Sequence, residues 1–422
     1  MDDTSPPSAD ALSPGEPTTP KRAVYLAILV AALGYFVDIY DLILFGVVRT
    51  ASLRDLGVAD ADMLEVGSRL LDAQMWGMLL GGIAWGVLGD RRGRLSVLFG
   101  SILTYSIANI ANGFVNDLDT YWLLRFVAGV GLAGELGAGM ALVAELMPAK
   151  SRGWGTTIVA SIGICGAVAA VAVGDTFEWR QAYWVGGGLG LFLLVLRLGV
   201  LESGMYQKVR SNDKVARGNF FALFTSKSRL VRYVAVILCG VPIWYAVGIL
   251  TIFSPEIGEA LGMSERPNAG TAIMACYIGL ALGDLASGAL SQLLRSRRRA
   301  LAAFLVLDVV AVILYFTVGP SSQLAFNACV GFLGFASGYW AVFVTVGAEQ
   351  FGTNLRATAA TTVPNFVRGS LVLLSASFRG LIEPLGAPGA AIAVGVVVIG
   401  VAFLSLLGIQ ETFGKSLDYV EE

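Results

Sequence analysis

The sequence predicts an all-α polytopic membrane protein with twelve transmembrane helices, arranged as two pseudo-symmetric six-helix bundles. Of its 422 residues, 56% are hydrophobic and 14% charged, and the mean hydropathy is +0.72. A soluble chain of this length could not bury so much apolar surface. The apolar segments are continuous, and each is about as long as a ~30 Å hydrocarbon core requires, whereas the strands of a membrane β-barrel would alternate apolar and polar residues. Finally, the second half of the chain repeats features of the first.

The apolar segments define twelve spans. We expect them at residues 23–48, 66–88, 95–114, 119–146, 153–174, 179–201, 229–253, 268–294, 299–319, 322–347, 357–380 and 388–410. The predicted organisation is therefore an N-terminal six-helix bundle at 21–201, a cytoplasmic linker at 202–228, a C-terminal six-helix bundle at 229–410 and a cytoplasmic tail at 411–422.

The first twenty residues, "MDDTSPPSADALSPGEPTTP", hold five of the thirteen prolines and almost no large apolar residues. This composition predicts a disordered tail at 1–20. The segment lacks the basic start and apolar core of a signal peptide, so we expect no cleavage.

The distribution of lysine and arginine predicts the orientation. With a cytoplasmic N-terminus, twenty basic residues fall on the cytoplasmic side and only six outside. Positive charge is enriched in cytoplasmic loops of membrane proteins. Both termini are therefore predicted to face the cytoplasm.

An internal repeat supports the division into two halves. "AELMPAKSRG" (144–153) ends the fourth span, and "AEQFGTNLRA" (348–357) ends the tenth span 204 residues later. Glu145 and Arg152 match Glu349 and Arg356 at the same separation. Two equivalent six-helix halves imply a pseudo-two-fold axis with a site between them.

Three stretches resemble the major facilitator superfamily. "GVLGDRRGR" (86–94) is similar to its signature between spans two and three, "RFVAGVGLAGELGAGMALVAELMPAKSRG" (125–153) to span four of its sugar-porter and organic-ion branches, and "ETFGKSL" (411–417) to the end of its sugar porters. The nearest branches are the sugar porters and the transporters that couple organic ions or metabolites to protons. The resemblance implies alternating access to a central site.

The same resemblance implies a gate on the cytoplasmic face. In this family an aspartate at the end of span two, here Asp90, faces the start of span eleven near Ala357, and paired charges clasp the helix ends. The residues implied in the gate are Gly86, Asp90, Arg91, Arg94, Glu145, Arg152, Glu349 and Arg356.

Charges inside the predicted spans are candidates for proton coupling. "GYFVDIYDLILFG" (34–46) carries Asp38 and Asp41, and a carboxylate in mid-membrane costs roughly 2.5–3.5 kcal/mol on insertion scales. By depth, both aspartates are candidate partners of Arg125 in span four, which is similar to the coupling pair of proton-driven porters. Glu135 is a further candidate proton site. The alternative is a structural cluster that fixes spans one and four.

Arg368, in "PNFVRGS" of span eleven, is the candidate anchor of an anionic substrate. Organic-anion porters are similar in using an arginine there. The alternative is a structural pair with Asp284 or Asp308. Other residues that could line the site are Asn365, Trp244, Tyr245, Tyr339 and Trp340.

Several classes of function are disfavoured. The chain has no histidine, its four cysteines lack metal-type spacing, and it carries neither a P-loop nor a GxGxxG turn. We therefore expect no enzyme activity, no metal, no cofactor and no nucleic-acid partner. The paired glutamines that sugar porters carry in span seven are replaced by "CGVPIWYAVG" (239–248), which disfavours a hexose.

The sequence thus predicts a secondary transporter in a bacterial inner membrane that couples proton entry to uptake of a small polar solute, anionic or zwitterionic. Its expected partners are the solute, protons and the lipid bilayer, and we expect a monomer. The alternatives are a proton-driven exporter of the same fold, a sugar:proton symporter, and a non-transporting receptor or lipid-handling protein on this scaffold.

Overall fold

The computed structural model describes residues 21–92, 94–136, 152–202 and 220–414, and within these ranges the regular structure is helical. The first half contains α1 (Lys21–Asp55), α2 (Met63–Arg92), α3 (Arg94–Asn112), α4 (Leu118–Leu132), α6 (Arg152–Thr176) and α7 (Trp179–Glu202), with a short 3₁₀ turn η1 (Asp60–Asp62). The predicted tail at 1–20 and most of the predicted linker lie outside the described residues.

The second half begins with η3 (Phe220–Leu223), α8 (Lys227–Tyr245), the π-helical η4 (Ala246–Thr251), α9 (Ser254–Ala260), α10 (Ala269–Leu293) and α11 (Arg297–Thr317). It continues through η5 (Gly319–Ser321), α12 (Gln323–Ala336), α13 (Trp340–Glu349), α14 (Thr353–Gly369) and α15 (Leu371–Ser405). Helix α15 comprises two spans, because Gly386 interrupts it with a φ of 69°. This positive φ suits glycine, which has no Cβ.

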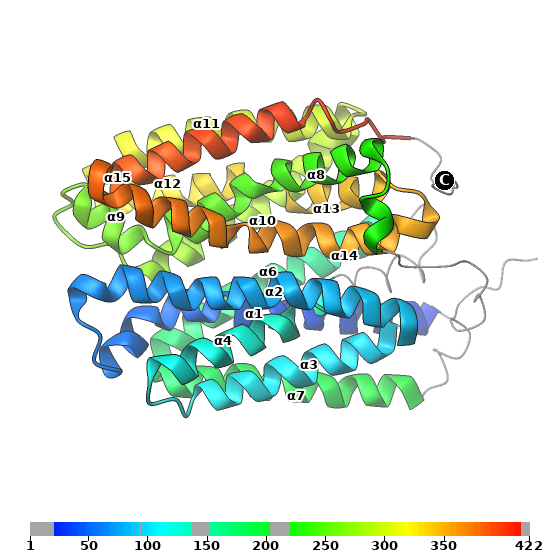
Figure 1. Cartoon of the computed structure of the whole chain (residues 1–422), viewed down its shortest axis with the longest axis horizontal. Helices are drawn as coiled ribbons and strands as arrows, with labels where there is room; N and C mark the ends of the chain where they lie inside the picture. The colour runs from blue at the N-terminus through cyan, green and yellow to red at the C-terminus, as the bar shows by residue number, and fades with distance from the viewer. Residues whose placement is uncertain (1–20, 93, 137–151, 203–219, 415–422) are drawn as a thin grey trace, which may run out of the picture.

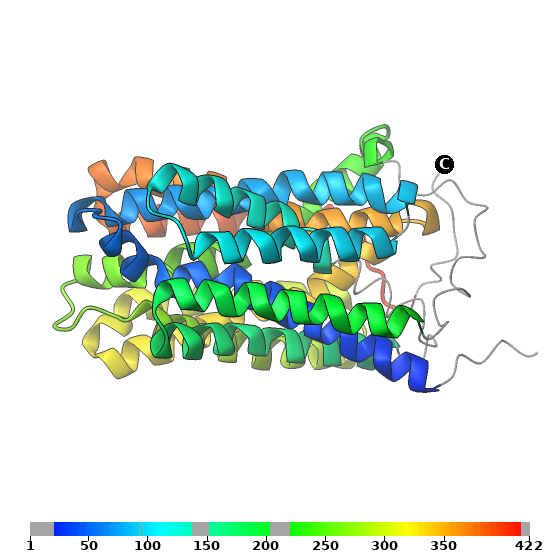
Figure 2. The ribbon, with the colours of Figure 1, turned by 90° about the horizontal axis from the view of Figure 1, so that it is seen from below.

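The helices form two layers. In Figure 1, α1 to α7 (blue to green) lie below α8 to α15 (green to red), and Figure 2 shows the lower layer from below. Within the lower layer α1 packs against α6, and α2 against α4; within the upper layer α10 packs against α12, and α8 against α15. The layers meet mainly along two seams, α2 with α14 and α6 with α10.

Short polar side chains fix where several helices begin. Asp117 accepts a hydrogen bond of 2.8 Å from the backbone N–H of Thr120 at the start of α4, and Asn268 caps α10 in the same way. Ser296 and Ser322 cap α11 and α12. Such caps satisfy N–H groups that have no partner inside the helix.

The fourth span, predicted as continuous, is broken. Helix α4 ends at Leu132, and a turn at Ala133–Gly134 follows. The indole of Trp85 donates a hydrogen bond of 2.6 Å to the carbonyl of Val130, and Asn365 of the other half donates one of 2.9 Å to the carbonyl of Ala133. Polar backbone groups freed inside a membrane protein need such partners.

The tenth span is broken at the equivalent place, between α12 and α13. Gly338 in this break lies 204 residues after Gly134, the same spacing as the sequence repeat. Here buried aspartates supply the partners. Asp308 accepts a hydrogen bond of 3.0 Å from the Ser337 hydroxyl, and Asp284 accepts one of 2.9 Å from the N–H of Ala341 in the first turn of α13.

A glycine lets α2 approach α14 closely. A Cβ added at Gly82 would lie 2.9 Å from Asn365, which is closer than side chains normally pack. Small residues are a common means of bringing helices together in membranes.

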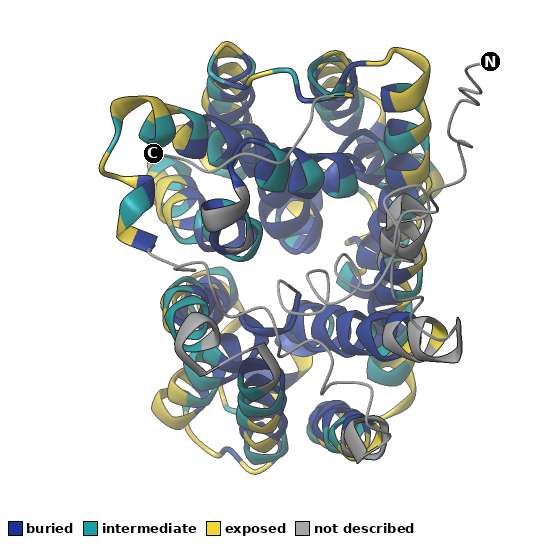
Figure 3. Ribbon diagram, turned by 90° about the vertical axis from the view of Figure 1, so that its right-hand side faces the viewer, coloured by how far each residue is buried: buried dark blue, intermediate teal, exposed yellow. Residues whose placement is uncertain are grey.

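The outer surface of the bundle is apolar. In Figure 3 the exposed residues lie at the periphery and the buried residues face inward. Large exposed side chains on this surface include Ile107, Phe192, Ile313, Val396 and Leu407. Within the described residues, six helical segments are long and apolar enough to cross a bilayer. Together with the apolar belt, they identify a multi-pass membrane protein of all-α fold, as predicted.

Candidate functional site

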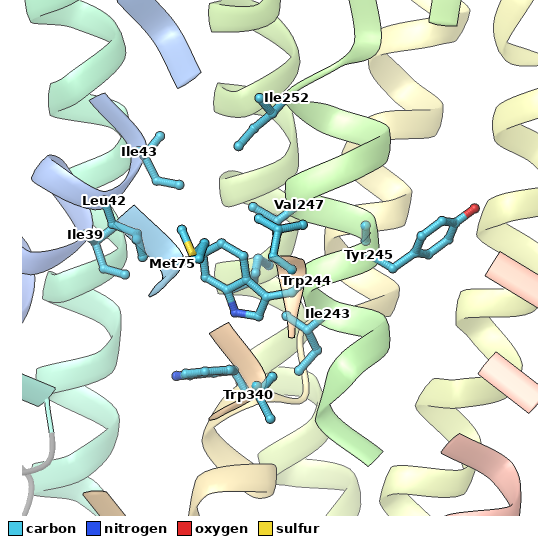
Figure 4. Close-up of a cluster of buried hydrophobic side chains, with 14 of the residues drawn as sticks. Ile39, Leu42, Ile43, Met75, Ile243, Trp244, Tyr245, Val247, Ile252 and Trp340 are labelled. Carbon is cyan, nitrogen blue, oxygen red and sulfur yellow. The ribbon is translucent and has the colours of Figure 1, made fainter. Parts of the chain in front are cut away.

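A central cavity lies where the two layers meet. Its free volume is about 30 Å³, so the cavity is small in this structure. Helices of both halves line it, with Tyr35, Ile39, Ile164, Ile243, Trp244, Val247, Tyr277, Leu280, Trp340 and Arg368. In Figure 4 the Trp244 side chain lies among Ile39, Ile243 and Trp340, whereas Tyr245 points away on another side of α8.

Arg368 brings a positive charge to this apolar cavity. Its Nη2 lies 3.0 Å from Oδ2 of Asp38 in α1, and both side chains are at most 1% exposed. The guanidinium also lies 5.7 Å from the centre of the Trp340 ring. Among the described residues, Nε and Nη1 of Arg368 and Oδ1 of Asp38 accept or donate no hydrogen bond. The arginine thus has N–H groups left for a second anion.

The sequence analysis predicted that Arg125 pairs with Asp41, Asp38 or both, whereas Asp38 pairs with Arg368. Arg125 instead donates a hydrogen bond to Gln74 of α2 and stacks 4.9 Å over the Phe45 ring. Asp41 is within electrostatic reach of Arg125 and beside the Asn109 amide, but no hydrogen bond to its oxygens is formed by the described side chains. Asp38 and Asp41 are three residues apart on α1, so they point about 60° apart around the helix and meet different neighbours.

Glu135 is paired inside its own half. It forms a two-point ion pair with Arg197 of α7, in which Nη1 of Arg197 lies 3.0 Å from Oε2 of Glu135. Arg197 was not among the predicted site residues. Its signal was a single arginine inside the apolar run "LFLLVLRLGV" (191–200).

Some of the other candidate residues line the cavity, and the rest form hydrogen bonds elsewhere. Asp284 and Asp308, the alternative partners considered for Arg368, bind the break in the tenth span instead. Tyr245 and Tyr339 donate their hydroxyl hydrogens to the carbonyls of Ala391 and Cys239, at 2.8 and 3.0 Å. These two tyrosines and Asn365 are not among the residues that line the cavity, whereas Trp244, Trp340 and Arg368 are.

Two further ion pairs join the halves at the end of the bundle where α1 finishes, which we call the Asp55 end. Arg379 of α15 lies 2.9 Å from Asp72 of α2, and Ser375 also donates to Asp72. Arg49 of α1 lies 2.7 Å from Glu256 of α9. These ion pairs therefore hold the two halves together at the Asp55 end.

A cavity between two six-helix halves, closed by ion pairs at one end, is the arrangement that an alternating-access transporter requires. The sequence profile of the Major Facilitator Superfamily matches residues 31–387. The chain belongs to this superfamily. The family consists of transporters, so the protein is a transporter and not an enzyme, as the sequence predicted.

Similar proteins of this superfamily carry names of organic-acid transporters. The 3-(3-hydroxy-phenyl)propionate transporter of Escherichia coli is 26% identical over 85% of this chain and 89% of its own length. The cis,cis-muconate transport protein of Acinetobacter baylyi is 26% identical over 93% of this chain and 95% of its own. The gentisate transporter of Corynebacterium glutamicum is 25% identical over 63% of each chain.

The gate implied by the superfamily resemblance lies at the opposite end, the Lys21 end, where α1 begins. Glu145 lies outside the described residues, as do the side chains of Asp90, Arg91, Arg94 and Arg152. Glu349 was expected to clasp Arg356. Its ion-pair partner in the described part of the chain is Arg297, at 3.5 Å, and the Thr412 hydroxyl donates to it at 2.6 Å. Glu349 ends α13 beside the start of α11, which explains this partner.

Glu411 reinforces the same region. Its carboxylate accepts hydrogen bonds from the Ser296 hydroxyl and from the backbone N–H groups of Arg297 and Arg298. Partial burial raises the pKa of Glu411, but these hydrogen bonds outweigh burial and leave the pKa below its usual value. The tail thereby caps α11 as an anion.

Proposed function

We propose that this transporter imports aromatic or conjugated organic acids together with protons. The observation that carries the proposal is Arg368, which offers unpaired N–H groups to a cavity walled by Trp244 and Trp340. The names of the three relatives agree with it, because hydroxyphenylpropionate, muconate and gentisate each combine a carboxylate with a planar π system.

The cavity suits such a ligand in two ways. A guanidinium binds a carboxylate through two parallel hydrogen bonds, which fixes the orientation of the acid. The two indoles offer flat apolar surfaces for the ring. The buried Nε1 of Trp340 has no hydrogen-bond partner among the described residues, so it can donate to a ring hydroxyl or a second carboxylate.

Binding at Arg368 provides a means of coupling to protons. The substrate carboxylate competes with Asp38 for the same guanidinium. A buried carboxylate that loses its cation is strongly disfavoured as an anion, so Asp38 takes up a proton when the substrate replaces it. One substrate carboxylate then travels with one proton. We assign Asp41, next to Arg125, the transfer of the proton to Asp38, and we assign the Glu135–Arg197 pair a structural role.

The membrane, the orientation and the oligomeric state are proposed as the sequence predicts them. We propose a monomer in a bacterial inner membrane, with the Lys21 end cytoplasmic and with bundles at 21–201 and 229–410. The Asp55 end then faces outward, and the described ion pairs close the outer side of the cavity.

The decisive experiment is transport into proteoliposomes of purified protein. With an alkaline interior, labelled 3-hydroxyphenylpropionate, muconate and gentisate should be tested separately, and at least one should accumulate until a protonophore is added. Glucose serves to test the sugar-symport alternative. The Arg368→Lys variant should bind the acid at least about tenfold more weakly, since an ammonium cannot make the paired hydrogen bonds. Export of the acid against an inward pH gradient, or accumulation that ignores that gradient, would overturn the proposal.

A further inference from the structure

We propose that a buried relay of hydroxyl groups, Ser52–Tyr121–Tyr183, conducts protons from the Asp55 end to Asp41. This inference rests on the proton coupling proposed above and adds a route for the proton. The relay lies wholly inside the first half of the chain and is separate from the solute cavity.

The three hydroxyls form a connected row. The Tyr121 hydroxyl lies 2.8 Å from the Tyr183 hydroxyl and 3.3 Å from Oγ of Ser52. All three side chains are buried, although they come from three different helices, α1, α4 and α7. A hydroxyl both donates and accepts hydrogen bonds, so a row of them can pass a proton along by shifting each hydrogen to the next oxygen.

The inner end of the row, Tyr183, lies near Asp41 without a hydrogen bond to it. The Tyr183 ring lies 5.8 Å from the Arg125 guanidinium and within electrostatic reach of Asp41. The helices packed around Asp41 present to it Asn109 and Tyr105 of α3, Arg125 of α4 and Tyr183 of α7, with Asp38 and Tyr40 on α1 itself.

Several polar atoms around Asp41 have no hydrogen-bond partner. Both oxygens of Asp41, both polar atoms of the Asn109 amide, and Nε and Nη1 of Arg125 have no partner among the residues that the structure describes. Buried polar groups normally have hydrogen-bond partners. A bridging water, or a proton bound to Asp41, would give these groups a partner. Rotation of the Asp41 carboxylate toward Tyr183 would serve the same purpose.

The outer end of the row is Ser52, which is buried and donates a hydrogen bond of 3.0 Å to the carbonyl of Arg49. Ser52 lies three residues before Asp55, the last residue of α1, whose side chain is 49% exposed and paired with Arg180. In the proposed relay, the Asp55 carboxylate collects protons from water and passes them to Ser52.

The route bypasses the solute. Ser52, Tyr121, Tyr183 and Asp41 are not among the residues that line the central cavity. Because the relay lies within one half, rocking of the halves does not interrupt it. The step that controls proton entry is then the transfer from Asp41 to Asp38, which is blocked as long as Asp38 stays paired with Arg368. Bound substrate favours the release of that pair, so proton entry is faster when the cavity is occupied.

The test uses Tyr121→Phe and Tyr183→Phe, which remove a hydroxyl and keep the ring. Tyr315→Phe is the matched control, since its buried hydroxyl donates to the carbonyl of Leu250 in the other half, at 2.8 Å. Two rates are measured in proteoliposomes for each protein. One is the initial rate of uptake driven by a pH gradient, and the other is counterflow exchange of the same acid without a gradient.

The relay predicts that each of the two variants loses at least about tenfold in gradient-driven uptake while its counterflow stays near that of the wild type. Tyr315→Phe should change both rates in parallel or not at all. If the two variants keep full gradient-driven uptake, or if both rates fall together, the relay is wrong. A wild-type protein that exchanges the acid but never responds to a pH gradient would instead refute the proposed coupling.

Discussion

Replacing Asp38 with asparagine should tighten substrate binding, although Asp38 itself is buried at the centre of the site. Nη2 of Arg368 lies 3.0 Å from the Asp38 carboxylate, and the pair is shielded from water. In the proposed scheme, the substrate first binds the unpaired N–H groups of Arg368 and then takes the place of Asp38 on that guanidinium. Asparagine keeps the size and the hydrogen-bond acceptor but removes the competing charge.

The magnitude follows from the geometry. Two unit charges about 4 Å apart attract each other by about 4 kcal/mol at an effective dielectric constant of 20. The asparagine oxygen retains part of this energy as a hydrogen bond to Arg368. That hydrogen bond is worth about 1.5–3 kcal/mol, so about 1–2.5 kcal/mol remains for the substrate carboxylate to gain, which corresponds to about a 5- to 60-fold lower Kd.

The assay is equilibrium binding of the acid to purified protein across a range of pH. The wild type should bind more tightly as the pH falls, because protonation of Asp38 frees Arg368. The Asp38→Asn variant should bind tightly at every pH, exchange substrate by counterflow, and fail to accumulate it under a pH gradient. Weaker binding by the variant at neutral pH, in a protein that still unfolds cooperatively, would refute the competition between Asp38 and the substrate.

Three further predictions follow. Asp41→Asn should keep counterflow but lose accumulation, without the gain in affinity expected for Asp38→Asn; full accumulation would remove Asp41 from the proton route. Asp72→Asn should open the Asp55 end, measured as faster cysteine labelling of the cavity from outside. The double exchange that places arginine at 72 and aspartate at 379 should restore the slow rate, and unchanged labelling in the single variant would argue against a gate. Because the pKa of Glu411 is lowered in the folded state, its contribution to stability should be present above pH ~4.5 and lost as the pH falls through the folded pKa. Glu411→Gln should therefore lower the Tm at pH 7 and lower it less at pH 3. Equal Tm values for the two proteins at pH 7 would show that the cap contributes nothing.

The fold could be predicted from the sequence because the length and hydropathy of a segment identify a membrane helix. The same information exposed most of the buried charges, since a charge inside an apolar run is conspicuous. It also contained two charges that were not predicted as site residues. Asp72 and Arg197 both lie inside predicted spans, and each is part of a buried or half-buried ion pair.

The partners of these charges could not be read from the sequence. Depth in the membrane follows from position along a helix, but the choice of partner depends on how each helix is rotated, which packing determines. Arg125 and Arg368 both had a suitable sign for Asp38, and only the arrangement of α1 against α14 selects Arg368. The breaks in spans four and ten were similarly hidden. Gly134 and Gly338 obey the 204-residue repeat, but hydropathy does not register a two-residue interruption.

The presence of two aspartates one turn apart in α1 now has a physical explanation. Their directions differ by about 60° around the helix, so Asp38 faces Arg368 in the other half while Asp41 faces Arg125 and Asn109 in its own half. Two carboxylates on one face would merely compete for a single cation. Placed as they are, Asp38 can respond to whether Arg368 is occupied by substrate, and Asp41 can hold a proton within the first half regardless of that occupancy. A single aspartate could not do both, because one that stays paired with Arg368 cannot receive the proton before the substrate arrives. In the proposed scheme, helix α1 is thus the element through which occupation of the cavity and supply of the proton act on each other.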